Sequence, residues 1–209
     1  MFLKFGQEEH IRDLFENGTI YMNSIQRFRL IEDNGLRGDN YEGISEIRNY
    51  LPGTFIIPEI NHEVHHLGIH LRQSYPEVLG NIYSLYCISS KTVANPLEFK
   101  IDKRNSEFGT HCLMIKNNPE FLSKIENALI LSGLPFRHGF VEYYDKNKVN
   151  GAITLFQKPV EYEYQKEFRI YVERPYIDPF VLKIGSLQNI AELFTSNDII
   201  RGLGARLNT

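Results

Sequence analysis

Hydrophobic and polar residues alternate near the end of the stretch 162–172, and this alternation is the clearest structural signal in the chain. The apolar positions of its second half would share one side of an extended segment: Phe168, Ile170 and Val172. The positions that would point the other way are Glu167, Arg169 and Tyr171. This period of two predicts a half-buried β-strand that carries charged side chains on its second side.

Gln165 and Glu167 lie two positions apart in the predicted strand. On a strand, side chains separated by two residues project from the same face, one pleat from each other. An amide and a carboxylate placed in this way can act on one ligand, so this pair is the main candidate for chemistry. The structural alternative is a salt bridge between Glu167 and Arg169 on the exposed face of an edge strand, where such pairs contribute little.

The remaining apolar runs predict a strand-rich chain. Strands are expected over residues 2–5, 19–22, 81–90, 108–115, 137–144, 151–156 and 180–184, with a meander of short strands after Ile44. Helical periodicity and stop signals predict helices over residues 7–16, 24–31, 118–132 and, briefly, 187–194. The stretch 81–90 is polar only at its ends and at Ser84, which favours a central strand. The fold class that follows is α+β, with mixed sheets and about three helices.

Composition and charge indicate the number of domains, the classes of partner and the cellular compartment. No Pro/Gly/Ser-rich linker or charge run divides the 209 residues, so we expect a single domain, 1–209. A net charge of -3 provides no basic field that would attract duplex nucleic acid. The chain has no apolar region of signal-peptide length and no run of eighteen apolar residues, which indicates a cytoplasmic protein without a membrane partner. Cys87 and Cys112 sit in apolar runs and are expected to be buried and reduced. The oligomeric state stays open.

The segment His62-Glu63-Val64-His65-His66 satisfies the zinc-protease pattern His-Glu-x-x-His. That chemistry needs the two histidines one turn apart on a stable helix, with the glutamate as base and a third ligand beyond. Here Pro58 precedes closely, Gly68 interrupts, and the residues that follow alternate with period two. The context therefore favours a solvated, histidine-rich strand or hairpin, and no bound metal is expected.

A polar loop over residues 32–43 is the second stretch that could form a site. It has three glycines, several carboxylates and two charged residues suited to ligand contact, Arg37 and Asp39. The acids do not follow the spacing of a twelve-residue calcium loop. The loop is either hydrated surface or a place where Arg37 or Asp39 touches a ligand.

Three separate places together resemble the ADP-ribosyltransferase superfamily of the Gln-x-Glu type. They are the opening strand with Lys4, the strand that closes in Ser89-Ser90, and the late strand with Gln165-Lys166-Glu167. The opening helix that ends in Asn17-Gly18 before the next strand is also similar to that family. The chain further resembles bacterial and phage proteins of unknown function that share this opening and a late Glu-Phe-Arg strand.

The resemblance implies a split β core, NAD as substrate, and an unidentified protein or nucleic acid as acceptor, in the setting of a toxin or of a defence or counter-defence factor. Glu167 would stabilise the oxocarbenium-like transition state and hold the ribose 2′-hydroxyl, while Gln165 would orient the acceptor. The implied roles at the NAD-binding residues are phosphate contact for Lys4, support for Ser89, and ring stacking for Tyr21 and Tyr86. The best-known members have arginine where Lys4 stands, and a lysine cannot supply the bidentate fork, so Arg27, Arg29 or Arg37 is a candidate substitute.

Two other functions stand beside the transferase. A non-catalytic domain on the same scaffold would bind a nucleotide or a partner protein, and the lysine in place of the first-strand arginine favours it. A zinc hydrolase would use His62, Glu63 and His66. The transferase is the preferred interpretation because its elements occur in the family's order.

Overall fold

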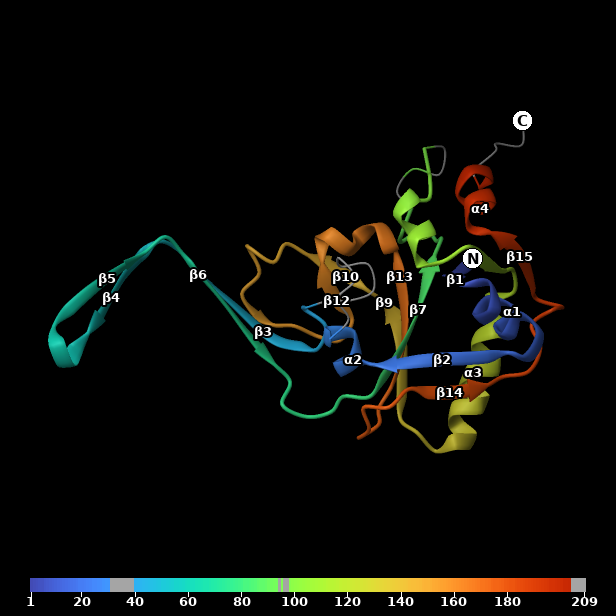
Figure 1. Ribbon diagram of the computed structural model, residues 1–209, viewed down its shortest axis with the longest axis horizontal. Helices are drawn as coiled ribbons and strands as arrows, with labels where there is room; N and C mark the ends of the chain where they lie inside the picture. The colour runs from blue at the N-terminus through green and yellow to red at the C-terminus, as the bar shows by residue number, and fades with distance from the viewer. Residues whose placement is uncertain (31–39, 94, 96–97, 204–209) are drawn as a thin grey trace.

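The computed structural model describes residues 1–30, 40–93, 95 and 98–203. Figure 1 shows a body of strands and helices from which a long, narrow arm extends. The body is built on one eight-stranded sheet in which every pairing is antiparallel. Its strands are β1 (Phe2–Gly6), β2 (Thr19–Ser24), β7 (Asn81–Cys87), β8 (His111–Ile115), β9 (Phe136–Phe140), β13 (Glu167–Val172), β14 (Phe180–Lys183) and β15 (Ala191–Thr195).

The sheet forks at β7. One edge of β7 pairs with the whole of β13, from Tyr86 to Asn81. The other edge is shared, because β1 pairs with it only at Tyr86 and Cys87 and β2 only at Asn81 and Ile82. Residues 83–85 of β7 therefore have no strand partner on that side, and the sheet divides there into a β1–β8–β15 branch and a β2–β14 branch.

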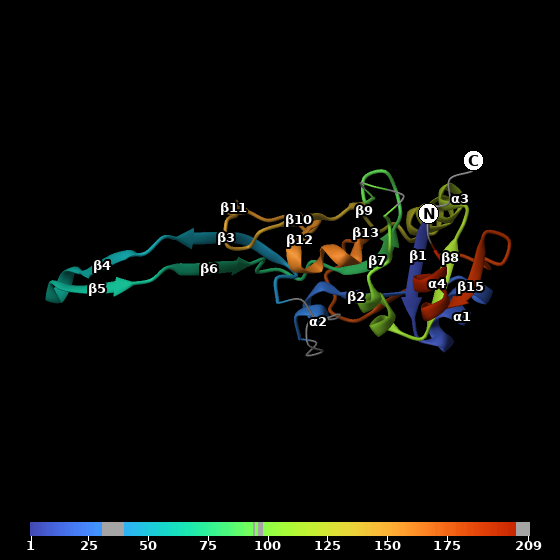
Figure 2. The same cartoon turned by 90° about the horizontal axis from the view of Figure 1, so that it is seen from above.

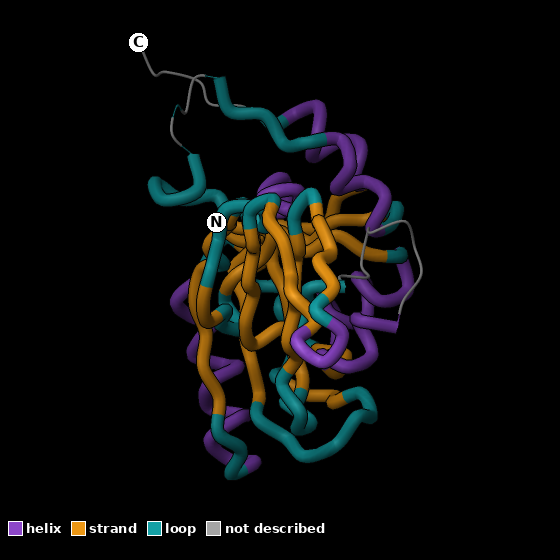
Figure 3. The backbone as a smooth tube through the Cα atoms, turned by 90° about the vertical axis from the view of Figure 1, so that its left-hand side faces the viewer, coloured by secondary structure: helices purple, strands orange, loops and turns teal. Residues whose placement is uncertain are grey.

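Helices lie on either side of the strand layer (Figure 3). They are α1 (Glu8–Asn17), which connects β1 to β2, α2 (Ile25–Leu30), α3 (Asn118–Ser132) and α4 (Ser196–Gly202). The larger core cluster includes buried residues of α1 and α3, and the second cluster includes Ile199 of α4. The buried face of α3 consists of the three predicted residues, Phe121, Ile125 and Leu129. Burying each such side chain stabilises the fold by about 1.5–3 kcal/mol.

Gly18 ends α1 as its sequence predicts. Its φ of 63° is left-handed, and its N–H donates to the carbonyl oxygens of Asp13 and Leu14. The turn is also crowded, because a Cβ added to Gly18 would lie 2.0 Å from the carbonyl oxygen of Gly185. Only glycine therefore fits at this junction between the first helix and β2.

The arm is one long hairpin formed by four strands. They are β3 (Ile44–Tyr50), β4 (Gly53–Ile57), β5 (His62–His66) and β6 (Ile69–Ser74). β3 pairs with β6, and β4 pairs with β5 beyond it, with a 3-10 turn at the tip, η1 (Pro58–Ile60). Figure 2 shows this ribbon extending away from the body. The expected meander after Ile44 is therefore wrong. The first and last of these four strands, β3 and β6, pair with each other, and so do the two strands between them in sequence, β4 and β5.

Shorter elements lie between the arm and the main sheet. β11 (Gly151–Ala152) pairs with β3, and β10 (Glu142–Tyr144) pairs in parallel with β12 (Gln157–Pro159). Two 3-10 helices, η2 (Lys103–Phe108) and η3 (Val160–Gln165), lie next to each other.

The α+β class with a strand-rich core is confirmed, and α1, α3 and α4 are the helices of seven or more residues among the described parts of the chain. Several predicted boundaries are wrong: the strand expected over 81–90 ends at Cys87, the one expected over 137–144 is divided into β9 and β10, and of 151–156 only β11 is a strand. The strand expected over 162–172 begins only at Glu167, because η3 occupies the preceding residues. The strand expected over 108–115 begins at His111. The expected helix 187–194 overlaps β15 instead, and the last helix follows at Ser196.

All six residues of β13 are buried, so its charged side does not face solvent. The cause is its place in the sheet. β13 lies between β7 and β9, and side chains cover both of its faces. The alternation in the sequence correctly predicted two faces, but the second face is a buried polar cluster.

Candidate functional site

A cavity of about 600 Å³ opens at the fork of the sheet. This volume lies in the range of small-molecule sites. Its walls come from β1, α1, β2, α2, β7, η2, β12, η3 and β13. Five of the residues predicted from the sequence line it: Lys4, Tyr21, Tyr86, Gln165 and Glu167. The structure therefore brings both halves of the predicted catalytic pair, and three of the predicted NAD-binding residues, into one space.

Glu167 is the first residue of β13, and it is 2% exposed. Its Oε1 accepts hydrogen bonds from Ser84 Oγ at 2.6 Å and from Arg169 Nε at 2.7 Å. Its Oε2 lies 2.8 Å from Lys158 Nζ. Burial by itself raises the pKa of Glu167, but the charges of Arg169 and Lys158 outweigh burial and hold the pKa well below its usual range. The carboxylate is therefore ionised at physiological pH.

Arg169 contacts Glu167 and is fully buried. Its guanidinium also holds Glu42 in a bidentate pair, with Nη1–Oε1 at 2.7 Å and Nη2–Oε2 at 3.0 Å. Nη1 donates further to the carbonyl oxygen of Leu155. Glu42, Arg169, Glu167 and Lys158 thus form a buried chain of two acids and two bases with no net charge, which is the condition under which burial of charge is tolerated.

Lys158 connects the two residues of the predicted pair. Its ammonium donates to Gln165 Oε1 at 3.0 Å and contacts Glu167 on the other side, and the residue is only 8% exposed. Gln165 ends η3, and Lys166, with a left-handed φ of 40°, separates it from β13. The expectation that the amide and the carboxylate share a strand face is therefore wrong. They reach the same cavity from two different elements, joined by a lysine.

Lys4 spans the fork. It extends from β1 to β7, where its Nζ donates to the carbonyl oxygen of Ser84 at 2.7 Å and lies 4.1 Å from the ring centroid of Tyr83. Because residues 83–85 have no strand partner on this side, that carbonyl is available to a side chain. The predicted phosphate contact of Lys4 would thus be made at the opening between the two branches of the sheet.

Two buried phenols also line the cavity. Tyr83 and Tyr86 are 4% and 5% exposed, and within the described part of the chain their hydroxyl oxygens have no hydrogen-bond partner. Burial raises the pKa of both, so they stay protonated. A buried hydroxyl without a partner is costly, and a bound ligand or water that accepts from it removes the cost. Tyr21, by contrast, is 53% exposed at the edge of the cavity.

Ser89 does not line the cavity. It follows β7 in a turn, where its N–H donates to Thr92 Oγ1 at 2.9 Å and its Oγ accepts from the N–H of Lys91 at 3.3 Å. The serine beside the carboxylate is Ser84, and its signal in the sequence was the single polar residue in the middle of the apolar run 81–90. Arg37 and Asp39 lie outside the described residues.

The histidine pattern lies far from this cavity, in the outer part of the arm. Residues 62–66 form β5, so His62 and His66 are not one helical turn apart. On a strand, four residues span roughly 13 Å, which is too far for two ligands of one zinc ion. Among the described residues, no group of three or more His, Cys, Asp or Glu side chains is arranged to hold a metal. Cys87 and Cys112 are buried and free, as predicted.

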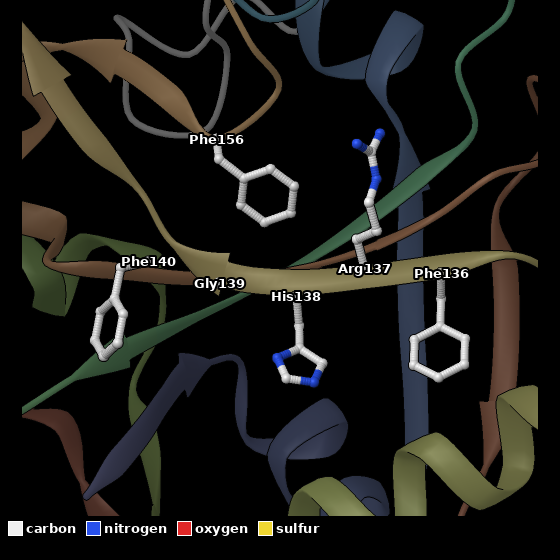
Figure 4. A pocket seen from close by; sticks show the side chains of 6 residues that line it. All are labelled: Phe136, Arg137, His138, Gly139, Phe140 and Phe156. Carbon is white, nitrogen blue, oxygen red and sulfur yellow. The ribbon is translucent and has the colours of Figure 1, made fainter.

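A second, shallower hollow of about 450 Å³ lies against β9 (Figure 4). Arg137 and Phe156 lie on one side of the strand, and Phe136, His138 and Phe140 on the other. None of the residues singled out from the sequence lines it, and His138 is engaged with Glu126 at 2.8 Å. The fork cavity is therefore the candidate functional site.

Comparison of the chain with protein-family models, with curated proteins and with solved structures finds no match. None of the helices formed by the described residues combines the length and apolar character needed to cross a membrane. The functional assignment accordingly rests on the cavity and its residues.

Proposed function

We propose that the fork cavity binds NAD and that the protein transfers the ADP-ribosyl group to a macromolecular acceptor, with Glu167 as the catalytic carboxylate. The observation that carries this proposal is the convergence of Lys4, Gln165 and Glu167 on one cavity from segments some 160 residues apart. The fork at β7, between the β1 and β2 branches of the sheet, further supports the split β core that the resemblance implies.

The reaction breaks the bond between ribose C1′ and the nicotinamide nitrogen, and the bonding electron pair leaves with nicotinamide. Positive charge develops on the ribose, and an ionised carboxylate beside it lowers the energy of that transition state. The acceptor nucleophile then forms a bond to C1′ and loses a proton. Glu167 is suited to the first step because it is ionised, buried and fixed in direction by Ser84 and Arg169.

The other walls fit the remaining parts of a dinucleotide. The ammonium groups of Lys4 and Lys158 are suited to phosphate oxygens, as point charges rather than as forks. Tyr86 and Tyr21 offer ring surfaces for stacking. The hydroxyls of Tyr83 and Tyr86 are buried without a hydrogen-bond partner among the described residues, so a ribose or amide oxygen that reached them would gain a hydrogen bond.

The second candidate is a nucleotide-binding domain without catalysis, and the cations on Glu167 favour it. Arg169 and Lys158 already neutralise much of the negative charge that the carboxylate would offer to an oxocarbenium ion. A ligand would then be held by Lys4 and the tyrosines, and no bond would be broken.

Release of nicotinamide from labelled NAD, in the presence of cell extract as a source of acceptor, tests the first proposal. Glu167→Gln should lower the rate about 100-fold or more, as expected for loss of a preorganised charge in the transition state. Glu163→Gln is the matched control, because Glu163 is an exposed carboxylate on η3, four residues earlier. Its rate should equal that of the parent.

Calorimetric titration with NAD separates the two candidates. Binding without nicotinamide release supports the non-catalytic domain, and equal release by Glu167→Gln refutes the catalytic role of Glu167. If NAD neither binds nor reacts, both assignments fail. Circular dichroism of each variant shows whether the fold is retained.

A further inference from the structure

The strand β9 is an end of the main sheet, because it pairs with β13 on one side and with no described strand on the other. An open strand edge presents backbone N–H and C=O groups with which another polypeptide can pair. All five residues of β9 also line the hollow of about 450 Å³ (Figure 4). The other two ends of the sheet, β14 and β15, line neither this hollow nor the fork cavity.

The register shows which backbone groups of β9 lack partners. Val141, just beyond the strand, donates its N–H to the carbonyl oxygen of Glu167. Bonded pairs recur at every second residue of an antiparallel ladder, so the odd-numbered residues of β9 bond to β13. The N–H and C=O groups of Phe136, His138 and Phe140 therefore point to the opposite edge, where no described residue pairs with them.

The next part of the same edge already carries a strand. Directly after β9 the chain continues as β10, which pairs in parallel with β12. The N–H of Glu142, the first residue of β10, donates to the carbonyl oxygen of Phe156, and Phe156 also lines the hollow. The edge is thus covered by a strand along β10 and left open along β9. A further strand at β9 would continue this pairing.

The side chains of β9 define the strand that would fit. On one side of β9, the rings of Phe136 and Phe140 pack against the larger core cluster, so apolar side chains beside them would extend that core (Figure 4). Arg137 projects from the other side and is exposed, with its guanidinium 5.4 Å from the ring centroid of Tyr171. It forms no salt bridge within the described part of the chain, so a carboxylate beside it would gain a partner.

The neighbouring charges also favour an acid in the added strand. The ammonium of Lys91 lies 5.0 Å from the ring centroid of Phe140, and it too has no salt bridge to a described carboxylate. Glu126, which approaches β9 from α3, is already paired with His138 at 2.8 Å. The fitting segment therefore alternates apolar residues with polar ones that include an acid.

We propose that β9 accepts an extended segment of a partner protein as an added strand, with apolar side chains at alternate positions and an acid facing Arg137. The edge itself indicates a polypeptide, because a row of strand-spaced N–H and C=O groups is matched by another strand. An identical edge is a poorer occupant. Two β9 edges paired about His138 would place both Arg137 side chains on one face of the junction without a carboxylate between them. The site shares no residue with the fork cavity and does not depend on NAD.

Fluorescence anisotropy with a labelled peptide tests the proposal on the full-length chain. The probe is Ser-Val-Thr-Val-Asp-Val-Thr-Val-Ser with fluorescein at its amino end, so the valines share one face of a strand and the aspartate lies on the other. The parent protein should bind it, and lysine in place of the aspartate should weaken binding roughly fivefold. Arg137→Glu should reverse this order of the two peptides. Absence of binding to the aspartate peptide overturns the proposal.

N-methylated peptides test whether backbone pairing holds the peptide. A methylated nitrogen cannot donate, and alternate nitrogens of a strand point to opposite edges. Methylation of one set, either the valines or the residues between them, should weaken binding at least tenfold, and methylation of the other set should leave it nearly unchanged. Sensitive valines indicate an antiparallel strand, and sensitive intervening residues a parallel one. Equal effects of the two sets contradict strand addition.

Proline substitution tests the edge from the side of the protein. His138→Pro removes an N–H that points away from β13, so it should weaken binding roughly tenfold. His138→Ala keeps that N–H and loses only the contact with Glu126, so it should bind like the parent. Val181→Pro is the matched control on β14. Val181 is 49% exposed, and its N–H points away from β2 because Ile184 donates to Gly18. Binding to this variant should be unchanged.

Circular dichroism and the unfolding temperature show whether each variant folds. If His138→Pro does not fold, Arg137→Glu and the two peptides still decide the outcome, since that change leaves the backbone intact. Equal binding by His138→Pro and Val181→Pro places the peptide elsewhere and refutes the assignment to β9. Light scattering coupled to size exclusion tests the other occupant. A parent of twice 24.4 kDa that His138→Pro converts to a monomer shows that a second copy takes this edge, and the proposal then fails.

Discussion

Replacement of Arg169 by methionine tests whether the buried charge chain holds the body together. Methionine fills a comparable length but carries no charge and donates no hydrogen bond. The substitution leaves two buried carboxylates, Glu42 and Glu167, without their shared guanidinium. Lys158 still contacts Glu167, so the larger uncompensated cost falls on Glu42.

The magnitude follows from the contacts that are lost. Arg169 makes three hydrogen bonds to carboxylates and one to a carbonyl oxygen, all of them buried. Removing one partner from a buried ion pair costs about 3–5 kcal/mol, because the remaining charge is not solvated. Natural domains have about 5–15 kcal/mol of stability, so this is a large share. For a chain of this length, a loss of that size lowers Tm by roughly 10 °C.

Urea unfolding followed by circular dichroism measures the loss, since the chain contains no tryptophan to report it by fluorescence. Arg48→Met is the matched control. Arg48 pairs with Glu46 at 2.7 Å, the same distance as Arg169 to Glu167, but its side chain is 59% exposed. The control should lose less than about 1 kcal/mol. If Arg169→Met is no more destabilising than Arg48→Met, the buried chain does not stabilise the fold and the reasoning is wrong.

Two further effects follow from the same structure. The pKa of Glu167 is depressed in the folded protein, so its stabilising effect is fully present above about pH 5 and is lost as pH falls toward the folded pKa. Between pH 3 and 5, the unfolding free energy of the parent should therefore fall more steeply with acid than that of Glu167→Gln, by up to about 1.4 kcal/mol per pH unit, and parallel curves would contradict the assignment. Gly18→Ala should cost more than Gly133→Ala in the same measurement. Both glycines have φ near 65°, where an alanine costs about 1–2 kcal/mol, but only at Gly18 would the new Cβ also collide with the backbone of Gly185. Equal losses would show that the turn relaxes.

Local signals in the sequence were sufficient for the elements whose stability is local. The helix that ends at Gly18 and the helix that buries Phe121, Ile125 and Leu129 have clear caps and a clear 3.6-residue period, and both form as predicted. The late strand was placed too early because it was expected to include Gln165, whereas residues 160–165 form η3. Nothing local shows that Lys166 adopts a left-handed conformation and starts the strand one residue later.

The long-range parts of the site could not be predicted from local patterns. Glu42 lies in a polar loop segment of the sequence, and no local pattern predicts that it is buried. Its burial becomes clear only from its pairing with Arg169, which is distant in sequence. Lys158 likewise has no neighbour in sequence that marks it as the link between Gln165 and Glu167. The structure of the arm likewise depends on long-range strand pairing, of β3 with β6 and of β4 with β5. The resemblance supplied the long-range information for Lys4 and Glu167, which is why these residues, and not Lys158 or Glu42, were singled out.

The two cations on Glu167 differ in their freedom to move, and this difference bears on the choice between the proposed functions. Arg169 is fully buried and is held from behind by Glu42, so a ligand in the cavity cannot displace it. Lys158 lines the cavity, where its ammonium contacts Gln165 and Glu167 and lies 5.3 Å from the ring centroid of Tyr162, and its flexible stem allows the ammonium to turn toward a phosphate. A dinucleotide that draws Lys158 away would expose one oxygen of Glu167 to the ribose while Arg169 keeps the carboxylate ionised and aligned. Catalysis would thus require the bound dinucleotide to draw Lys158 away from Glu167. A non-catalytic binding domain would require only that Lys158 stays on Glu167.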